Sequence, residues 1–108
     1  MNLTIGQYLH ELRINHQLTL TQLGAKLGID SGALSKIEHG KKRLSQKHLP
    51  IIAEVFSLNL QSLKNEFVSE NIAHDILSQD CDAEVLQLAQ AKIRIFKDKF
   101  VKQAQLDL

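Results

Sequence analysis

Apolar residues recur every three or four positions along the chain, which is the period of an α-helix with one buried face. A first helical segment is expected over residues 5–16. Thr4 is its predicted N-cap, because a threonine oxygen can accept a hydrogen bond from the first helical turn. The apolar positions predicted to lie mainly on one face of this segment are Ile5, Leu9, Leu12 and Ile14.

Two short helical segments follow, over residues 19–27 and 30–39. Thr19 can cap the first, with Gln22 three residues later in the spacing of a capping box, and Asp30 can cap the second. Each segment is followed by a glycine, Gly28 or Gly40. Glycine can adopt the left-handed conformation that ends a helix, so both are predicted helix stops.

Three further helical segments are expected in the rest of the chain. One covers residues 47–58, where Pro50 is tolerable only near the helix start. The next starts after Asn59 and runs to about residue 77, and the last starts near residue 80 or 82 and runs towards the C-terminus. The last segment carries apolar residues in the 3-4-3-4 spacing of a heptad seam: Leu86, Ala89, Ile93, Phe96 and Phe100.

The composition favours one all-α domain of ordinary size. The 108 residues include eighteen Leu against four Val and three Thr, and unbranched side chains lose little rotamer freedom in a helix. The single cysteine, Cys81, excludes an internal disulfide and so a disulfide-stapled secreted fold. The N-terminus has no signal-peptide pattern, and no apolar run approaches the roughly 20 residues that span a bilayer. We therefore expect a cytoplasmic protein without a membrane segment.

The charge is divided unevenly, although the net charge is only +1. Residues 1–48 carry seven Lys or Arg and three Asp or Glu, a balance of +4. Residues 49–108 carry six Lys or Arg and nine Asp or Glu, a balance of −3. A local positive balance of this kind is the electrostatic footprint expected of a surface that contacts DNA phosphates.

Residues 18–43 have the pattern of a helix, a short turn with glycine, and a second helix. Gly24 places a small residue where the two helices must approach closely. The second helix is expected to bury Leu34 and Ile37 and to present the opposite face to a DNA major groove. The residues of that outer face are Ser31, Gly32, Ser35 and Lys36.

These residues resemble the XRE family of helix-turn-helix regulators, which includes lambda-type phage repressors, restriction-modification controller proteins and many antitoxins. The resemblance lies in the runs TLTQLGAKLGID (residues 19–30) and LSKIEHGK (34–41) and covers about residues 5–63. It implies a compact bundle of five helices that binds double-stranded DNA as a dimer.

The resemblance also implies the site residues. Ser31, Gly32, Ser35 and Lys36 would face bases. Phosphates would be contacted by Thr19, Gln22, His39, Lys41, Lys42 and Arg43. Leu20 replaces a glutamine that is usual in the family, and small residues at 31 and 32 limit direct base readout. Lys36 is the best candidate for a guanine contact, and DNA shape is expected to contribute to specificity.

Other chemistry finds no support in the pattern. Glu38 is more easily explained by pairing with a basic neighbour, or by capping a structural element, than by reading a base. The five scattered His and the single Cys do not have zinc-ligand spacing. No set of nucleophile, base and orienting residue can be placed on the chain. We therefore expect no catalytic residue, no metal and no cofactor.

The resemblance leaves the C-terminal residues without a role in the bundle. We expect a DNA-binding domain over residues 1–65 and a helical extension over residues 66–108. The last two helical segments, with the heptad seam of the final one, would join two copies of the chain, because an amphipathic helix needs an apolar partner. Acidic residues 66–84 and basic residues 92–102 could also pair the last two helices, within or between chains. The alternative is an antitoxin or adaptor whose C-terminal helices bind another protein.

Overall fold

The computed structural model describes residues 2–106, with side-chain surroundings for residues 2–99. Over this range the chain is helical and contains no β-strand, which confirms the expected all-α class. The chain divides into two compact units, Met1–Asn71 and Ile72–Leu108. Among the described residues, none of the helices is both long and apolar enough to cross a membrane.

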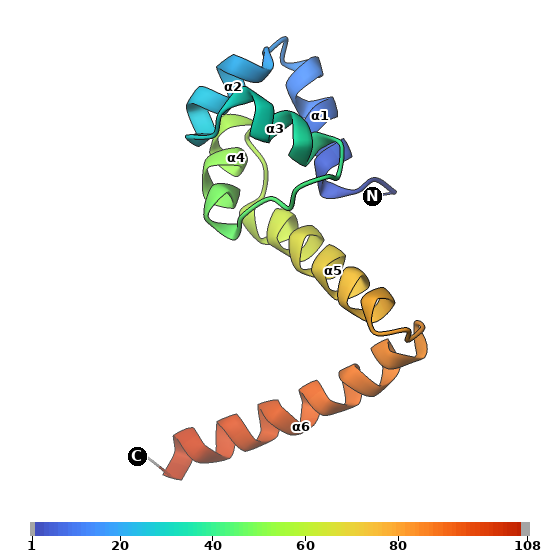
Figure 1. Cartoon of the computed structure of the whole chain (residues 1–108). Coiled ribbons are helices and arrows are strands. Elements are labelled where there is room, and N and C mark those ends of the chain that lie inside the picture. Colours follow the sequence, from blue (N-terminus) through green and yellow to red (C-terminus); the bar gives the residue numbers. More distant parts are fainter. Residues whose placement is uncertain (1, 107–108) are drawn as a thin grey trace. The chain divides into compact units, whose positions relative to one another are not determined.

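The first unit is a bundle built from short helices (Figure 1). Its elements are α1 (Ile5–Asn15), α2 (Leu20–Leu27), α3 (Ser31–Glu38), the one-turn 3-10 helix η1 (Gln46–His48), α4 (Leu49–Val55) and the first part of α5 (Leu60–Ser78). All of these except η1 contribute to one apolar core, whose largest fully buried side chains are Leu9, Leu23, Leu34, Leu49 and Ile52. The five-helix bundle inferred from the resemblance is confirmed.

α1 buries a different row of side chains from the one predicted. Ile5 and Leu9 are buried and Leu12 is partly buried, as expected, but Ile14 is 52% exposed. Arg13 is only 8% exposed and takes the next position on the buried row. Positions 5, 9 and 13 follow each other at intervals of four and so share one face of the helix. The assignment of Ile14 to the buried face was therefore wrong.

The segment predicted as one helix over residues 47–58 is divided. It begins with η1, continues as α4 and ends at Val55, because Ser57 adopts a left-handed conformation (φ +54°). The long helix after Asn59 is confirmed as α5, and the Asn59 side chain caps it by accepting the Ser62 N–H (2.8 Å).

The core continues past residue 65, which is the predicted end of the DNA-binding domain. Phe67 of α5 is buried in the core, and the Glu70 carboxylate accepts the backbone N–H of Ile5 (2.9 Å). These contacts make the first half of α5 part of the bundle. The division into a DNA-binding domain and a dimerisation extension stays a prediction about function.

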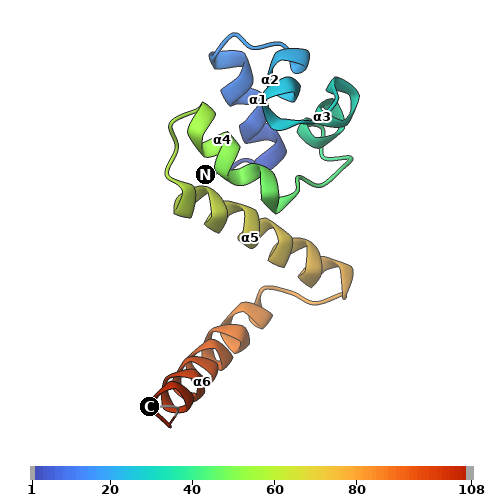
Figure 2. The ribbon, with the colours of Figure 1, turned by 90° about the vertical axis from the view of Figure 1, so that its left-hand side faces the viewer.

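The second unit contains the end of α5, a turn and α6 (Glu84–Leu106). Figure 2 shows α6 as one uninterrupted helix. The described residues of its predicted seam, Leu86, Ala89, Ile93 and Phe96, are all exposed in the single chain. The side chain of Phe100 lies outside the part of the structure whose surroundings are described.

Candidate nucleic-acid interface

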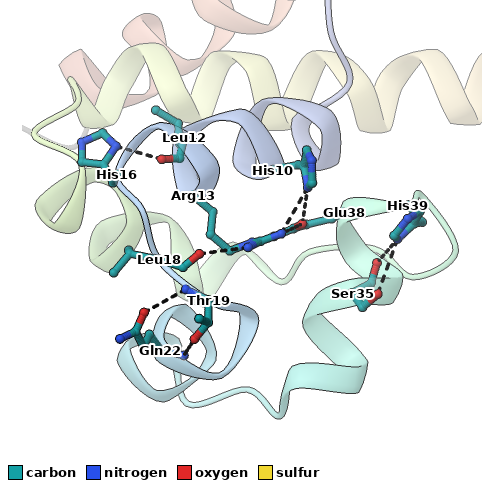
Figure 3. A network of polar contacts seen from close by, with 10 residues as sticks. All are labelled: His10, Leu12, Arg13, His16, Leu18, Thr19, Gln22, Ser35, Glu38 and His39. Carbon is teal, nitrogen blue, oxygen red and sulfur yellow. Dashed lines mark hydrogen bonds and ion pairs between the residues drawn. The ribbon is translucent and has the colours of Figure 1, made fainter.

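The start of α2 is fixed by a reciprocal cap. Thr19 Oγ1 accepts the N–H of Gln22 (3.0 Å), and Gln22 Oε1 accepts the N–H of Thr19 (2.9 Å), which is the predicted capping box (Figure 3). The bond uses the carboxamide oxygen of Gln22 and leaves its NH₂ group as a donor. Both residues are exposed, so the geometry permits a phosphate contact in addition to the cap.

The turn between α2 and α3 depends on two glycines. Gly28 ends α2 in the left-handed conformation (φ +71°). A Cβ atom on Gly24 would collide with the carbonyl oxygen of Ile29. Gly24 therefore allows the turn to lie directly on α2, which sharpens the prediction that a small residue is required there.

α3 has one buried face and one exposed face. Asp30 caps its start, because Asp30 Oδ1 accepts the N–H of Ala33 (2.7 Å). Leu34 and Ile37 are buried in the core as predicted. The four predicted base-facing residues lie together on the outer face, since positions 31, 32, 35 and 36 are neighbours on a helix. Ser31, Gly32 and Lys36 are exposed and Ser35 is half-buried.

The end of α3 holds the basic loop by its backbone. Gly40 turns the chain with φ +76°. The carbonyl of Lys36 then accepts the N–H groups of Lys41 (2.8 Å) and Lys42 (3.3 Å). The side chains of Lys41, Lys42 and Arg43 are exposed, and Leu44 is buried at the far end of the loop. The backbone of Lys41 and Lys42 is thus tied to the C-terminal end of α3.

His39 is used locally as well. Its Nδ1 atom lies 2.7 Å from the carbonyl oxygen of Ser35 and 3.5 Å from the Ser35 hydroxyl (Figure 3). This contact places the ring against the last turn of α3, with Nδ1 donating to the carbonyl.

A hollow beside the turn adds two residues that the sequence analysis did not place in the site. It has a volume of about 350 Å³, and its lining includes the turn residues 28–30, Lys42 and Arg43 of the basic loop, Lys47 and His48. Partial burial and the charge of Lys47 lower the pKa of His48, so the imidazole is neutral at pH 7. The available signal was the position of Lys47 in the sequence, close after the Lys41–Arg43 triplet.

A buried ion pair joins α3 to α1. Glu38 is 6% exposed, and its two carboxylate oxygens accept bonds from Arg13 Nε (2.8 Å) and Nη2 (3.0 Å). Arg13 also donates from Nη1 to the carbonyl of Leu18 (2.9 Å), and His10 Nδ1 lies 2.7 Å from Glu38 Oε1. Figure 3 shows these groups meeting between the two helices. The prediction that Glu38 pairs with a basic neighbour is confirmed, and the partner is Arg13.

The ion pair shifts the titration of Glu38. Burial alone raises the pKa of its carboxyl group, but the hydrogen bonds and positive charge of Arg13 and His10 outweigh it. The net effect is a lowered pKa, so Glu38 is charged at neutral pH.

A Cβ atom on Gly6 would collide with the carbonyl oxygen of Ile37, which shows how closely α1 lies against the end of α3.

The comparisons agree with this arrangement. The family model described as helix-turn-helix matches residues 9–63, half of the chain. A comparison with curated protein sequences gives no significant match.

Among solved structures, the clp gene regulator ClgR from Corynebacterium glutamicum matches at 21% identity and a TM-score of 0.51. That match covers 80% of this chain and 89% of that chain. A second structure of ClgR matches at 22% identity and a TM-score of 0.49, over 62% of this chain and 87% of that one. A chain of a SinR protein/SinI protein complex matches at 21% identity and a TM-score of 0.48, over 87% and 98%. The family match and the fold together show that the chain belongs to the XRE-type helix-turn-helix family of DNA-binding transcription regulators.

Proposed function

We propose that this regulator is a repressor or autoregulator that binds a pseudo-palindromic operator as a dimer. The observation that carries the proposal is the outer face of α3, where Ser31, Gly32, Ser35 and Lys36 are accessible together and a basic loop is anchored at the helix end. A helix of this kind fits the major groove with short side chains close to the base edges and cationic groups beside the backbone.

The roles divide by side-chain length and position. Lys36 is the long polar side chain of the α3 face and is assigned a guanine contact, and Ser35 is assigned a base or phosphate contact. Phosphates are assigned to Thr19, Gln22, His39, Lys41, Lys42 and Arg43, to which we add Lys47 from the hollow. With short residues at 31 and 32, operator shape supplies part of the specificity.

The C-terminal helix supports the proposal of a dimer. The exposed seam of α6 offers an apolar surface for a second copy, which would place two α3 helices about 34 Å apart on one face of the DNA. A dimer bound to an operator within a promoter would block access of RNA polymerase.

The test is binding of the purified protein to its own upstream DNA, measured over a range of salt concentrations. We expect a protected pseudo-palindrome and an affinity that falls steeply with salt. Binding that shows neither sequence preference nor steep salt dependence would contradict the proposal.

Three lysine variants separate the roles. Lys36→Ala should relax specificity at one base position, with a loss of about tenfold or more against the preferred base. Lys41→Ala should weaken binding to all sequences alike and reduce the salt slope by about 1. Lys64→Ala, an exposed lysine on α5, is the matched control and should change neither. Equal loss of specificity from the first two would contradict the role assignments.

The same exposed seam favours one second candidate, an antitoxin or adaptor that binds another protein through α6. A purified wild-type chain that stays monomeric but forms a defined complex with the product of a neighbouring gene would support it. A stable homodimer that accounts for all operator binding would count against it.

A further inference from the structure

The seam of α6 is bordered by positive charge on both sides. Lys92 and Lys99 lie on one flank of the apolar row and Lys97 on the other, at the positions that set partner choice in paired helices. The acidic residues of the helix between 84 and 99, Glu84 and Asp98, lie on the opposite face. The ion pairs found among residues 2–99 involve none of these side chains.

This arrangement disfavours the pairing of α6 with a second α6. In a parallel pair, Lys92 of each helix would face Lys97 of the other. In the antiparallel register that superimposes the two seams, Lys92 would face Lys99. In either orientation, the two-fold symmetry of the dimer would create two pairs of facing lysines. Neither orientation brings an acidic residue of α6 to the contact.

α5 carries an apolar row of similar length that is also uncovered. Val68, Ile72 and Ile76 follow each other at intervals of four, on the side of the helix opposite to the buried Leu63 and Phe67. Val68 and Ile72 are 41% and 44% exposed, and Ile76 is half-buried. The row spans about 12 Å and the described seam of α6 about 15 Å, at 1.5 Å per residue.

The charge beside the α5 row is the opposite of that beside the α6 seam. Residues 65–82 of α5 and the turn contain five Asp or Glu and no Lys or Arg, and one of the five, Glu70, is bonded to Ile5 on the bundle side. Asp75 borders the apolar row, and Asp80 and Asp82 follow in the turn. The described side chains of α6, residues 84–99, include four Lys or Arg and two acidic residues on the face opposite to the seam. The two rows are therefore complementary in length, apolar character and charge.

Within the second unit, α6 leaves the end of the α5 row uncovered. The turn closes α5 through the N–H of Cys81, which donates to the carbonyl of Ile76 (3.0 Å), with Asp80 in a left-handed conformation (φ +59°). Asp82 Oδ1 then accepts the N–H of Glu84 (3.0 Å) and opens α6. With both helix ends fixed in this way, Ile72 and the seam of α6 are exposed in the single chain.

We propose that α6 of one chain packs on the apolar outer row of α5, beside Asp75, of a second copy, so that the dimer is an exchange of C-terminal helices and not an α6–α6 coiled coil. The inference rests on the dimer of the proposed function and names the surface that forms it. Two-fold symmetry makes the contact twice, once with each α6.

One charge reversal separates this arrangement from the α6–α6 pair. Lys92→Glu should raise the dimer dissociation constant about tenfold, since an attraction to the Asp75 side of α5 becomes a repulsion at two symmetric contacts. In an α6–α6 dimer the same change would place the new carboxylate opposite a lysine and tighten the dimer. Sedimentation equilibrium of the full chain measures the difference.

Two further variants complete the test. Asp75→Lys combined with Lys92→Glu should restore the wild-type dissociation constant, and Arg94→Glu, a matched reversal off the seam, should leave it unchanged. A tighter Lys92→Glu dimer, or no change in any variant, overturns the exchange while leaving the dimer of the proposed function intact. A wild-type chain that is monomeric both alone and on its operator overturns both.

Discussion

α3 and α6 differ in what determines their position. α3 has eight residues, yet it is held by a side-chain cap, two core residues and a buried ion pair to α1. α6 has 23 residues, and none of its described side chains is buried. A short helix with many tertiary contacts is a rigid platform for base recognition, whereas a long helix without them needs a partner. The two helices therefore suit different tasks: α3 is positioned to recognise DNA, and α6 is available for assembly with a partner.

The largest expected effect is on the ion pair that fixes α3. Arg13→Ala should lower the free energy of unfolding of the bundle by about 3–5 kcal/mol, because it leaves the Glu38 carboxylate buried without its main partner. Urea unfolding followed through Tyr8, the single tyrosine in a chain without tryptophan, measures it. A loss no larger than that of Lys64→Ala would show that the pair does not hold α3.

A matched pair of truncations compares the two helices directly. Leu34→Ala in α3 should cost about 2–5 kcal/mol of bundle stability by opening a cavity. Ile93→Ala in α6 should leave the Tyr8 transition of the monomer unchanged, because the side chain is 53% exposed, and should weaken the dimer instead. Equal losses in the monomer would contradict the contrast between the helices.

A smaller effect is expected at the cap of α2. Thr19→Ala should cost about 1 kcal/mol, since the N–H of Gln22 loses its acceptor. Thr19→Ser retains the hydroxyl and should stay close to wild type in the same urea experiment. A serine variant as unstable as the alanine variant would show that the threonine methyl group, and not the cap, matters.

The smallest expected effect is a pH dependence of the platform. The pKa of Glu38 is lower in the folded protein than in the unfolded chain, so its contribution to stability is complete above the unfolded value, near 4.3. It is lost as the pH falls through the folded pKa. Wild type should therefore lose more stability than Glu38→Gln between about pH 6 and about pH 3. Identical slopes for the two proteins would contradict this assignment.

The sequence was informative wherever the cause of a structure is local. The caps at Thr4, Thr19 and Asp30 and the stop at Gly28 depend on residues within one helical turn, and the structure confirms them. The outer face of α3 was predictable for the same reason, because helical periodicity alone decides which residues share it.

The failures were at contacts between segments distant in the chain. Arg13 is buried in α1 because Glu38, 25 positions away, compensates its charge. Hydrophobic periodicity alone gives no reason to expect the buried row to include Arg13 and to leave Ile14 exposed. Lys47 reaches the hollow because η1 folds back beside the α2–α3 turn.

The loop that carries Lys41 and Lys42 is anchored on the backbone carbonyl of Lys36, not on its side chain. A Cβ atom at Gly32 would lie 3.2 Å from the capping Oδ1 of Asp30, but the side chains at positions 31 and 36 are exposed and lie outside the core. Substitutions there can change the preferred operator while the phosphate-facing loop and the fold keep their geometry. The protein is therefore built so that new binding specificities can evolve, or be selected in a library of α3 variants, without a loss of stability.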